Sequence, residues 1–402
     1  MERPLLILSD VHISRAYGGR AAAQLSALVT EHNDSEIVLA GDIFDLSLDP
    51  AHTPLEDSVG AAFAPHPGLK QALSSHVQTG GKLTLVPGNH DAALSQDGGF
   101  ALRKLLAPQR DDAVEVSQWF ARRGDVHIEH GHLYDPDCAT NHPLADPSGR
   151  SEGLGTALMR RFVAPNDAFA FAHANQTTPA SGLAQAVEHW GIQAPVVISN
   201  YFRAAISLCL EAGLHKERVR RQILQGEARI AHHAAQVGLD PTILQALVVL
   251  APEPTHHSFR ATFQRLYFDR ILAGLGLVTG VGALASAGLG AGLTADRFVS
   301  SGGTLTTMGA LLATCGGGYL ALNVSRKKNR YGNAVVGQLS EAARGVAALT
   351  KSQLVVFGHT HVEVDEPGYV NLGSFGFGQP EKPFLRVDTN GHHTRGCVPS
   401  YG

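Results

Sequence analysis

Short apolar runs bounded by Gly, Asp or Pro recur along the chain, at residues 5–9, 37–40, 83–86, 126–128 and 354–357. Continuous apolar runs of this length predict strands that are buried on both faces. Helical spacing between the early runs predicts helices at residues 20–32, 68–79 and 99–106. Two further strands are predicted at residues 369–372 and 384–387. The pattern therefore predicts an α/β fold, with a layered sheet whose core is split in sequence.

The segment that interrupts this core, about residues 140–352, is rich in Ala and Leu and has helical spacing with little strand signal. Its first part predicts several soluble helices. One of them includes residues 201–210, and another includes the mixed-charge run 216–221, which we interpret as a solvated helix face. We therefore divide the chain into a core part (1–139), a cap-like helical insertion (140–270), an apolar hairpin (271–325), a basic linker with a helix (326–350) and a second core part (351–402).

Two long stretches of the interruption, residues 271–295 and 298–325, contain no charged residue. Each is longer than the roughly 20 residues that a helix needs to cross a bilayer. Because only Asp296 and Arg297 separate them, the two stretches predict a transmembrane hairpin with a short turn. Basic side chains flank its outer ends, which predicts that both ends and the catalytic core lie in the cytoplasm. These flanking residues are Arg260, Arg265, Arg270 and the run 326–330.

Glycines in the first stretch, at 276 and 280 and at 288 and 292, have the spacing that lets helices approach closely in lipid. Ser and Thr are frequent in the second stretch, and many glycines weaken a lipid-exposed helix. The alternatives are a Gly-rich hairpin buried in a soluble cytoplasmic protein and a flexible low-complexity segment.

Composition excludes several classes of protein. The net charge of -4 and a pI near 6.6 give no overall basic field, so we do not expect nucleic acid as a partner. Four cysteines lie far apart without a CxxC pair, which argues against a zinc knuckle or a disulfide framework and fits a reducing compartment. The N-terminal apolar run is too short for a signal sequence. The 21 histidines, by contrast, direct attention to a metal site.

Five short motifs at the ends of predicted strands carry oxygen or imidazole groups. They are Asp10-x-His12, Gly41-Asp42, Gly88-Asn89-His90-Asp91, His130-Gly131-His132 and Gly358-His359-x-His361. A spacing of two places both side chains on one side of an extended backbone, and a glycine permits the sharp turn before the next ligand. The carboxyl ends of strands are where open α/β sheets collect ligands. Each motif alone is common by chance, but five in this order predict one site.

This ordered series resembles the calcineurin-like metallophosphoesterase family, over about residues 1–137 and 351–402. The resemblance implies a β-sandwich flanked by helices and two divalent metal ions. The first ion would be held by Asp10, His12, Asp42 and His361. The second would be held by Asp42, Asn89, His130 and His359, so that Asp42 bridges. Carboxylate, amide and imidazole ligands without thiolate suit Mn, Fe or Zn.

The resemblance also implies a reaction, the hydrolysis of a phosphate ester or diphosphate. Two ions can clamp the phosphate and lower the pKa of a bridging water, which supplies hydroxide near neutral pH. His90 is similar to the family's catalytic histidine and would protonate the leaving oxygen, with Asp91 holding its imidazole. We interpret Asp45 as a residue that supports a ligand or the loop. His132 stays outside the ligand set.

The run 357–362 followed by 369–375 is similar to the arrangement in bacterial UDP-2,3-diacylglucosamine pyrophosphohydrolases, which cleave a lipid-linked diphosphate at the membrane surface. Those enzymes carry Arg where this chain has His90, and their insertion is a short lid without a hairpin. We therefore expect a phosphorylated small-molecule or lipid-linked substrate, with membrane lipid as a further partner. The alternative class is a scaffold or partner-binding module with a weak metal site. A nuclease is disfavoured, because the chain lacks a basic groove with interleaved aromatics.

Overall fold

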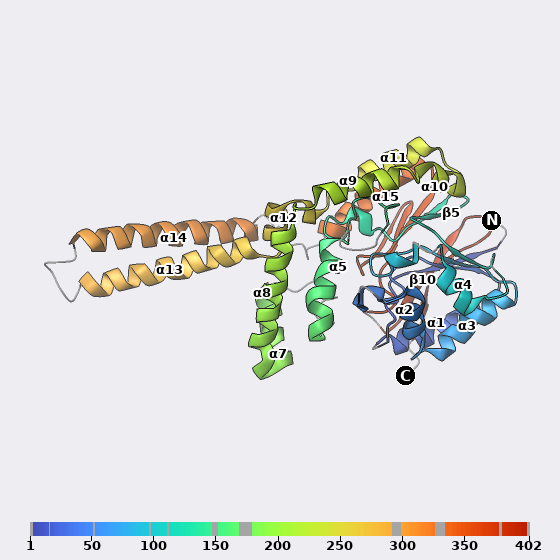
Figure 1. The fold of residues 1–402 in the computed structure, drawn as a ribbon, viewed down its shortest axis with the longest axis horizontal. Helices are drawn as coiled ribbons and strands as arrows, with labels where there is room; N and C mark the ends of the chain where they lie inside the picture. The colour runs from blue at the N-terminus through green and yellow to red at the C-terminus, as the bar shows by residue number, and fades with distance from the viewer. Residues whose placement is uncertain are drawn as a thin grey trace.

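A computed structural model describes the chain at residues 3–15, 17–50, 53–95, 98–110, 112–146, 152–168, 179–291, 299–325, 334–377 and 380–399. Two sheets and the helices that cover them form the main body, and a long helical hairpin projects away from it (Figure 1). The predicted mixed α/β fold is confirmed. The division of the chain into five segments stays a prediction.

The first sheet has six strands in the order β11-β10-β1-β2-β3-β4. The strands are β1 (Leu5–Leu8), β2 (Glu36–Leu39), β3 (Leu83–Leu85), β4 (Val114–Val116), β10 (Lys382–Val387) and β11 (His393–Val398). Strands β1 to β4 are parallel, whereas β10 runs antiparallel to both β1 and β11. The last strands of the chain therefore extend the sheet that the first strands begin.

The second sheet has five strands in the order β5-β6-β7-β9-β8. These strands are β5 (Ala121–Arg123), β6 (Val126–Ile128), β7 (Leu354–Phe357), β8 (Glu363–Glu366) and β9 (Tyr369–Leu372). Strand β6 pairs in parallel with β7, although more than 200 residues separate them in sequence. Because both strands end at the same edge, the loops that follow them meet there.

Successive side chains of each central strand point alternately into the core between the two sheets and into the core under the helices. Both faces are buried, which explains the continuous apolar runs. In β1, Leu5 and Ile7 pack between the sheets with Val356 and Val370 of the second sheet. Leu6 and Leu8 pack on the other face, among the helices. The predicted buried strands are thus confirmed. Strands β4, β5, β8 and β11 are short or partly exposed, and the apolar pattern did not reveal them.

Helices cover the outer faces of both sheets. The first sheet is covered by α1 (Gly19–Glu31), α2 (Leu55–Phe63), α3 (Pro67–Gln78) and α4 (Phe100–Leu106). The second sheet is covered by α10 (Ile230–Val237), α11 (Pro241–Leu250) and α15 (Val335–Thr350). The three early helices that the sequence predicts are confirmed within two residues, and α2 is an addition.

The rest of the insertion is helical as predicted. Its helices are α5 (Leu154–Leu158), which continues as the π-helix η4 (Met159–Val163), α7 (Pro179–Trp190), α8 (Ala194–Glu211), α9 (Lys216–Glu227) and α12 (Phe259–Arg265). Short 3₁₀ turns are η1 (Leu46–Leu48), η2 (Ala92–Ser95), η3 (His132–Tyr134), η5 (Ala164–Asn166), η6 (Gly191–Gln193) and η7 (Thr255–His257). The charged run 216–221 opens α9 and is mostly exposed, so the predicted solvated face is confirmed.

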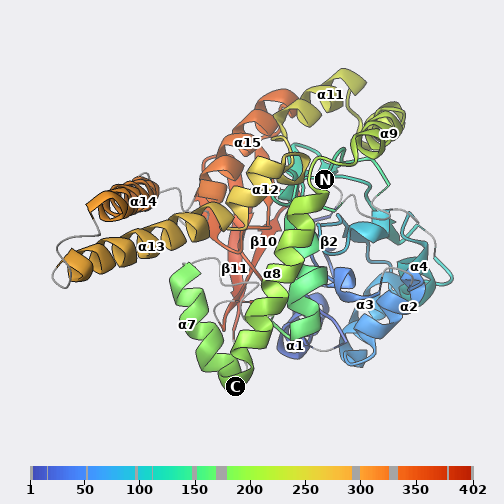
Figure 2. The same cartoon turned by 60° about the vertical axis from the view of Figure 1, so that its left-hand side comes forward.

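The projecting hairpin consists of α13 (Phe268–Ala291) and α14 (Val299–Ser325), which lie side by side in both views (Figures 1 and 2). A Cβ on Gly280 would lie 2.5 Å from the backbone of Gly309 and Ala313, and one on Gly316 would lie 2.4 Å from the Ala273 carbonyl oxygen. The backbones of the two helices are therefore in direct contact at these glycines. Gly292 and the turn residues Asp296 and Arg297 lie outside the described residues.

Apolar side chains on the outside of the hairpin are left exposed in the described structure. Leu272, Leu275, Val278 and Leu311 are each more than half exposed. By length and composition, residues 268–287 are the one described segment that could cross a membrane, with a mean hydropathy of 1.5. Arg265, expected as a flanking charge, instead forms an ion pair with Asp137, with 2.5 Å between its Nε and the carboxylate.

Candidate active site

The five motifs meet at the edge where the central strands end. Asp10 follows β1, Asp42 follows β2 and Asn89 follows β3 in the first sheet. His130 follows β6 in the second sheet, and His359 and His361 follow β7. The parallel pairing of β6 with β7 brings the last two motifs together across the insertion. Together with His12, these six side chains make up the seven predicted metal ligands, and all seven lie in one largely buried region.

Most of these residues do not have the extended backbone that the spacing argument assumed. Asp10, His12, Asp42, His359 and His361 all have φ between 52° and 70°. The extended-backbone explanation is therefore wrong. Left-handed backbone at residues other than Gly costs of the order of 1–3 kcal/mol each and persists only where the surroundings enforce it. Here the His12 N–H donates to the Asp42 carbonyl at 3.0 Å, and the His359 N–H donates to the Asp10 carboxylate at 3.0 Å.

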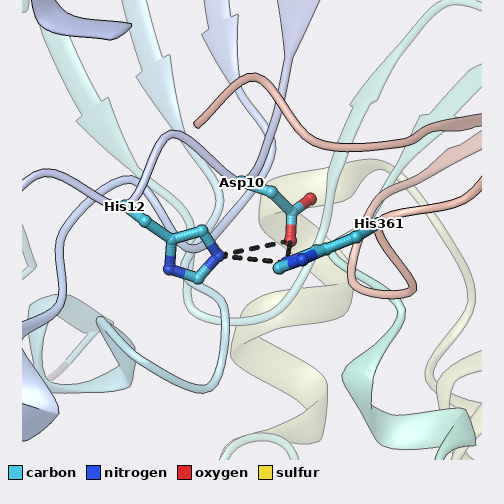
Figure 3. A group of neighbouring side chains, drawn as sticks. All are labelled: Asp10, His12 and His361. Carbon is cyan, nitrogen blue, oxygen red and sulfur yellow. Dashed lines mark hydrogen bonds and ion pairs between the residues drawn. The ribbon is translucent and has the colours of Figure 1, made fainter. Parts of the chain in front are cut away.

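The first cluster consists of Asp10, His12 and His361, whose side chains point at one another (Figure 3). Asp10 Oδ1 lies 3.2 Å from His361 Nε2 and 3.8 Å from His12 Nε2. The two imidazole nitrogens are 3.1 Å apart. One carboxylate oxygen and two ring nitrogens thus converge on a common point.

The second cluster consists of Asp42, His130 and His359, whose donor atoms lie within 4.8 Å of one another. His130 Nε2 is 3.2 Å from Asp42 Oδ2 but makes no hydrogen bond of acceptable geometry. Asn89 belongs to the same region, since the backbone N–H of the next residue, His90, donates to Asp42 Oδ1 at 2.8 Å. Asp42 also groups with His12 and His90. It therefore lies between the two clusters.

Buried atoms without partners show that these residues fit metal ions. Asn89 donates its amide Nδ2 to Thr156 at 3.3 Å, and its Oδ1 is buried with no hydrogen-bond partner in the described part of the chain. His130 Nδ1 lies 3.1 Å from the Ala40 carbonyl, so its Nδ1–H donates there and Nε2 is the nitrogen left to bind an ion. A buried polar atom without a partner costs free energy that a bound cation removes.

Two further imidazoles are fixed in the same way. His12 Nδ1 lies 2.9 Å from Asp45 Oδ1, which directs Nε2 toward Asp10 and His361. His359 Nε2 lies 3.1 Å from Asp135 Oδ2, which leaves Nδ1 for the second cluster. Metal-binding histidines usually donate their other N–H to an oxygen in this manner. The donor set therefore suits divalent cations.

The field of the carboxylates favours positive charge in the site. Burial lowers the pKa of His130, but Asp42 and Asp10 outweigh it and raise that pKa to about 9. Burial likewise raises the pKa of Asp42, and the neighbouring histidines, His130 first, outweigh it and leave that pKa far below its usual value. Asp42 thus stays ionised despite its burial.

His90 is held by Asp45 and not by Asp91. His90 Nδ1 lies 2.7 Å from Asp45 Oδ1 and 3.4 Å from Ser47 Oγ, while Nε2 faces Asp42 Oδ2 at 3.9 Å. Burial lowers the pKa of His90, but Asp42 and Asp45 outweigh it and raise that pKa above its usual value. The expectation that Asp91 orients this imidazole is wrong.

Asp91 instead holds the backbone of the first sheet's loops together. Its buried carboxylate accepts N–H groups of Gly88 at 2.6 Å, Ile43 at 2.7 Å, Phe44 at 3.2 Å and Asp42 at 3.3 Å. Burial and the nearby charge of Asp42 raise the pKa of Asp91 to about 6. Asp91 therefore positions the loop that carries Asp42.

Sequence reasoning missed several residues near the site, among them Asp135, Thr156 and Arg160. Asp135 contacts His359, Thr156 contacts Asn89, and Arg160 donates to the Ser47 carbonyl at 3.3 Å. Thr156 and Arg160 come from α5 and η4, so the insertion packs directly on the loop that carries His90. No spacing signal marked them. His132 is buried, and its ring lies 5.4 Å from that of His130.

Comparison with protein families gave a match to the calcineurin-like phosphoesterase model over residues 3–184. That stretch includes the first four motifs, and the fifth, at 358–361, lies beyond it. Comparison with curated proteins gave no match for the chain. The family uses two divalent metal ions, for which Mn, Fe and Zn are all typical, and the Asp and His clusters can hold such ions. Residues 3–184 are therefore a calcineurin-like phosphoesterase domain, and this family is a group of metal-dependent phosphoric ester hydrolases.

Proposed function

We propose that this protein is a dinuclear phosphoesterase that hydrolyses a phosphate ester or diphosphate and is anchored to a membrane by α13 and α14. The observation that carries the proposal is the pair of ligand clusters on either side of Asp42. Asp10, His12 and His361 gather on one side, and Asn89, His130 and His359 gather on the other.

The positions of the side chains suggest which residues would bind each ion. Asp10, His12, Asp42 and His361 would hold one ion, and Asp42, Asn89, His130 and His359 would hold the other. When bound, such a pair clamps the phosphate and supplies a hydroxide nucleophile near neutral pH. Asp45 and Asp135 keep the tautomers of His12 and His359 that leave a nitrogen lone pair for the ion.

His90 is the proton donor in this proposal. Its Nδ1–H is held by Asp45, and its Nε2 faces Asp42. The raised pKa favours the protonated imidazole, which is the state that a general acid needs. The leaving oxygen would take its proton from Nε2. Asp91 contributes through the backbone and does not touch the reacting groups.

The membrane part of the proposal rests on the exposed apolar surface of the hairpin. In residues 268–287 only 6% of the 18-residue apolar window is buried within the described structure. A soluble hairpin would normally bury its apolar side against the body, whereas this one projects away from it (Figure 1). A bilayer would cover this surface and place the cytoplasmic catalytic domain beside lipid. That position favours a lipid-linked or other membrane-associated phosphorylated substrate.

The activity test uses full-length protein in detergent, loaded with Mn²⁺, and p-nitrophenyl phosphate and its diester as general substrates, followed by lipid-linked and nucleotide diphosphates. We expect hydrolysis by the wild type and a loss of at least about 100-fold in Asp42→Asn. Asp57→Asn, an exposed carboxylate on α2, is the matched control. Equal rates in wild type and Asp42→Asn would contradict the proposal.

The alternative is a scaffold in which the metal site serves structure. It predicts stoichiometric, tightly bound metal without hydrolysis of any phosphoester.

Membrane attachment is tested separately by fractionation. Release of the protein by high salt alone would show surface attachment, and retention until detergent is added would support a spanning hairpin.

A further inference from the structure

A small cavity lies beside the turn that carries Asn89 and His90. It accommodates water-sized spheres over about 40 Å³ and is bordered by Pro87, Gly88 and Ala92 on the side of that turn. Residues 140–143, 145, 146 and 222, all of which belong to the helical insertion, also line it. Since one water needs about 10–15 Å³ by this measure, the cavity is large enough for a few waters or one short polar arm of a ligand.

Four buried polar atoms from its lining lack hydrogen-bond partners in the described structure. They are Gln118 Oε1, His132 Nδ1, Thr140 Oγ1 and His142 Nε2. Buried polar side-chain atoms in native proteins are nearly always paired, with protein, water or ligand. A cavity with four such atoms beside a catalytic turn is therefore built to receive a polar group.

The chemistry of that group follows from His142. The Leu144 N–H donates to His142 Nδ1 at 3.1 Å, so Nδ1 is the acceptor and the proton resides on Nε2. The nearest carboxylate, Glu227, is 3.8 Å from Nε2 and too distant for a hydrogen bond. Burial lowers the pKa of His142 to about 4, which keeps the ring neutral. His142 Nε2 is thus an unpaired donor.

Gln118 Oε1 requires a ligand group that donates, because an amide oxygen can only accept a hydrogen bond. A hydroxyl group satisfies both, since it accepts from His142 and donates to Gln118. A carboxylate or a fully ionised phosphate has no proton to donate, and an ammonium cannot accept. Among the described lining residues there is no Lys or Arg, and the one charged side chain is Asp146, which disfavours a second anionic group.

The insertion fixes this wall in place. A Cβ on Gly226 of α9 would lie 1.9 Å from His142 Nδ1, so the imidazole packs directly against this glycine. The Asn141 side chain hydrogen-bonds to Gln222 of the same helix. Contacts within the insertion therefore support this wall of the cavity.

We propose that this cavity is the subsite for the alcohol part of the substrate, and that it selects an uncharged, hydroxyl-bearing group such as that of a polyol or sugar phosphate. The inference rests on the proposed function and names its substrate class. In the reaction, water oxygen joins phosphorus, the bond from phosphorus to the alcohol oxygen breaks, and that oxygen takes up a proton.

The test compares glycerol 1-phosphate with propyl phosphate, which has the same carbon chain without the two hydroxyls, and uses p-nitrophenyl phosphate as a general substrate. Wild-type protein should cleave glycerol 1-phosphate with a kcat/KM at least about tenfold higher than propyl phosphate. Thr140→Val and Gln118→Met should reduce this ratio to about threefold or less, with little change for propyl phosphate. Thr30→Val, on the exposed face of α1, is the matched control.

Hydrolysis of all three esters with no preference in the wild type would overturn the subsite and leave the proposed function intact. A preference that survives both substitutions would also overturn it, because the selection would then arise elsewhere. Absence of any hydrolysis would overturn the proposed function and the subsite together.

A second measurement does not depend on turnover. Trp119 lines the cavity, and the only other tryptophan of the chain is Trp190. In a Trp190→Phe background, metal-free protein should show a saturable change of Trp119 fluorescence with glycerol 1-phosphate, and Thr140→Val should weaken the apparent affinity by about threefold or more. An identical response to propyl phosphate would contradict a hydroxyl-selective subsite.

Discussion

Gly88 lies so close to Asp42 that a Cβ on it would meet the Asp42 carboxylate oxygen at 2.2 Å. The same relationship recurs in the other motifs. A Cβ on Gly41 would lie 2.4 Å from the His130 ring, and one on Gly358 would lie 2.3 Å from the Asp10 carboxylate. Of the three glycines, only Gly41 has a positive φ. Gly88 and Gly358 are therefore required for space and not for a turn.

This relationship predicts the effect of Gly88→Ala. The added methyl must displace the Asp42 carboxylate, which lies between the two ligand clusters, and misplacement by about 1 Å can cost about 100-fold in rate. We expect a loss of this size in kcat/KM together with reduced metal content, measured by steady-state kinetics and metal analysis. The control is Gly60→Ala in α2, where a Cβ meets nothing within 4 Å. Normal activity of Gly88→Ala would show that Asp42 tolerates displacement.

Asp45 is expected to matter for two histidines at once. It lies 2.9 Å from His12 Nδ1 and 2.7 Å from His90 Nδ1, so Asp45→Asn weakens the support of both. Loss of such a partner typically costs about 10–100-fold in activity or metal affinity. We expect a fall of this size in kcat, with global folding retained by circular dichroism. Asp57→Asn should behave as wild type, and an equally active Asp45→Asn would remove Asp45 from the site.

The sequence predicted the parts of the fold that a repeating pattern encodes. Runs such as 5–9 and 354–357 are apolar because each strand faces two cores, and this signal survives without any knowledge of the partner strand. The motifs also located the site residues near strand ends. Parallel pairing of β6 with β7 then brings together segments that the insertion separates.

Other features could not be read from the sequence, because they depend on contacts between distant segments. The left-handed backbone of Asp10, His12 and His359 is held by N–H bonds to neighbouring carbonyl or carboxylate groups, and the residue types alone do not predict it. Asp91 follows His90 directly, yet its side chain turns toward the backbone of residues 42–44. Asp135 belongs to no motif and is placed beside His359 by the loop after β6.

Acid sensitivity should arise partly from His233, which is buried near Trp119 and Phe120. Burial lowers its pKa to about 4, whereas an unfolded chain has about 6.5. A depressed pKa means that the stabilising contribution is complete above pH 6.5 and is lost as the pH falls toward 4. The maximum loss is of the order of 3 kcal/mol.

We therefore expect His233→Leu to unfold with a smaller pH dependence between pH 6.5 and 4 than the wild type, measured by urea denaturation across that range. His232→Leu changes the exposed neighbour on the same helix and should retain the wild-type slope. If both variants follow the wild type, the acid sensitivity arises from other buried groups.

The hairpin gives a prediction that separates helix packing from lipid contact. A Cβ on Gly280 would lie 2.5 Å from the backbone of Gly309, whereas one on Gly282 meets nothing within 4 Å. Gly280→Leu must therefore force α13 and α14 apart, at a cost of about 1–3 kcal/mol or more, while Gly282→Leu adds apolar surface that faces outward. We expect Gly280→Leu to lower the yield of monodisperse protein extracted from membranes in detergent, measured by size-exclusion chromatography, and Gly282→Leu to leave it unchanged. If Gly282→Leu instead aggregates while Gly280→Leu behaves as wild type, α13 does not pack against α14 through Gly280. Its exposed side would then contact protein rather than lipid.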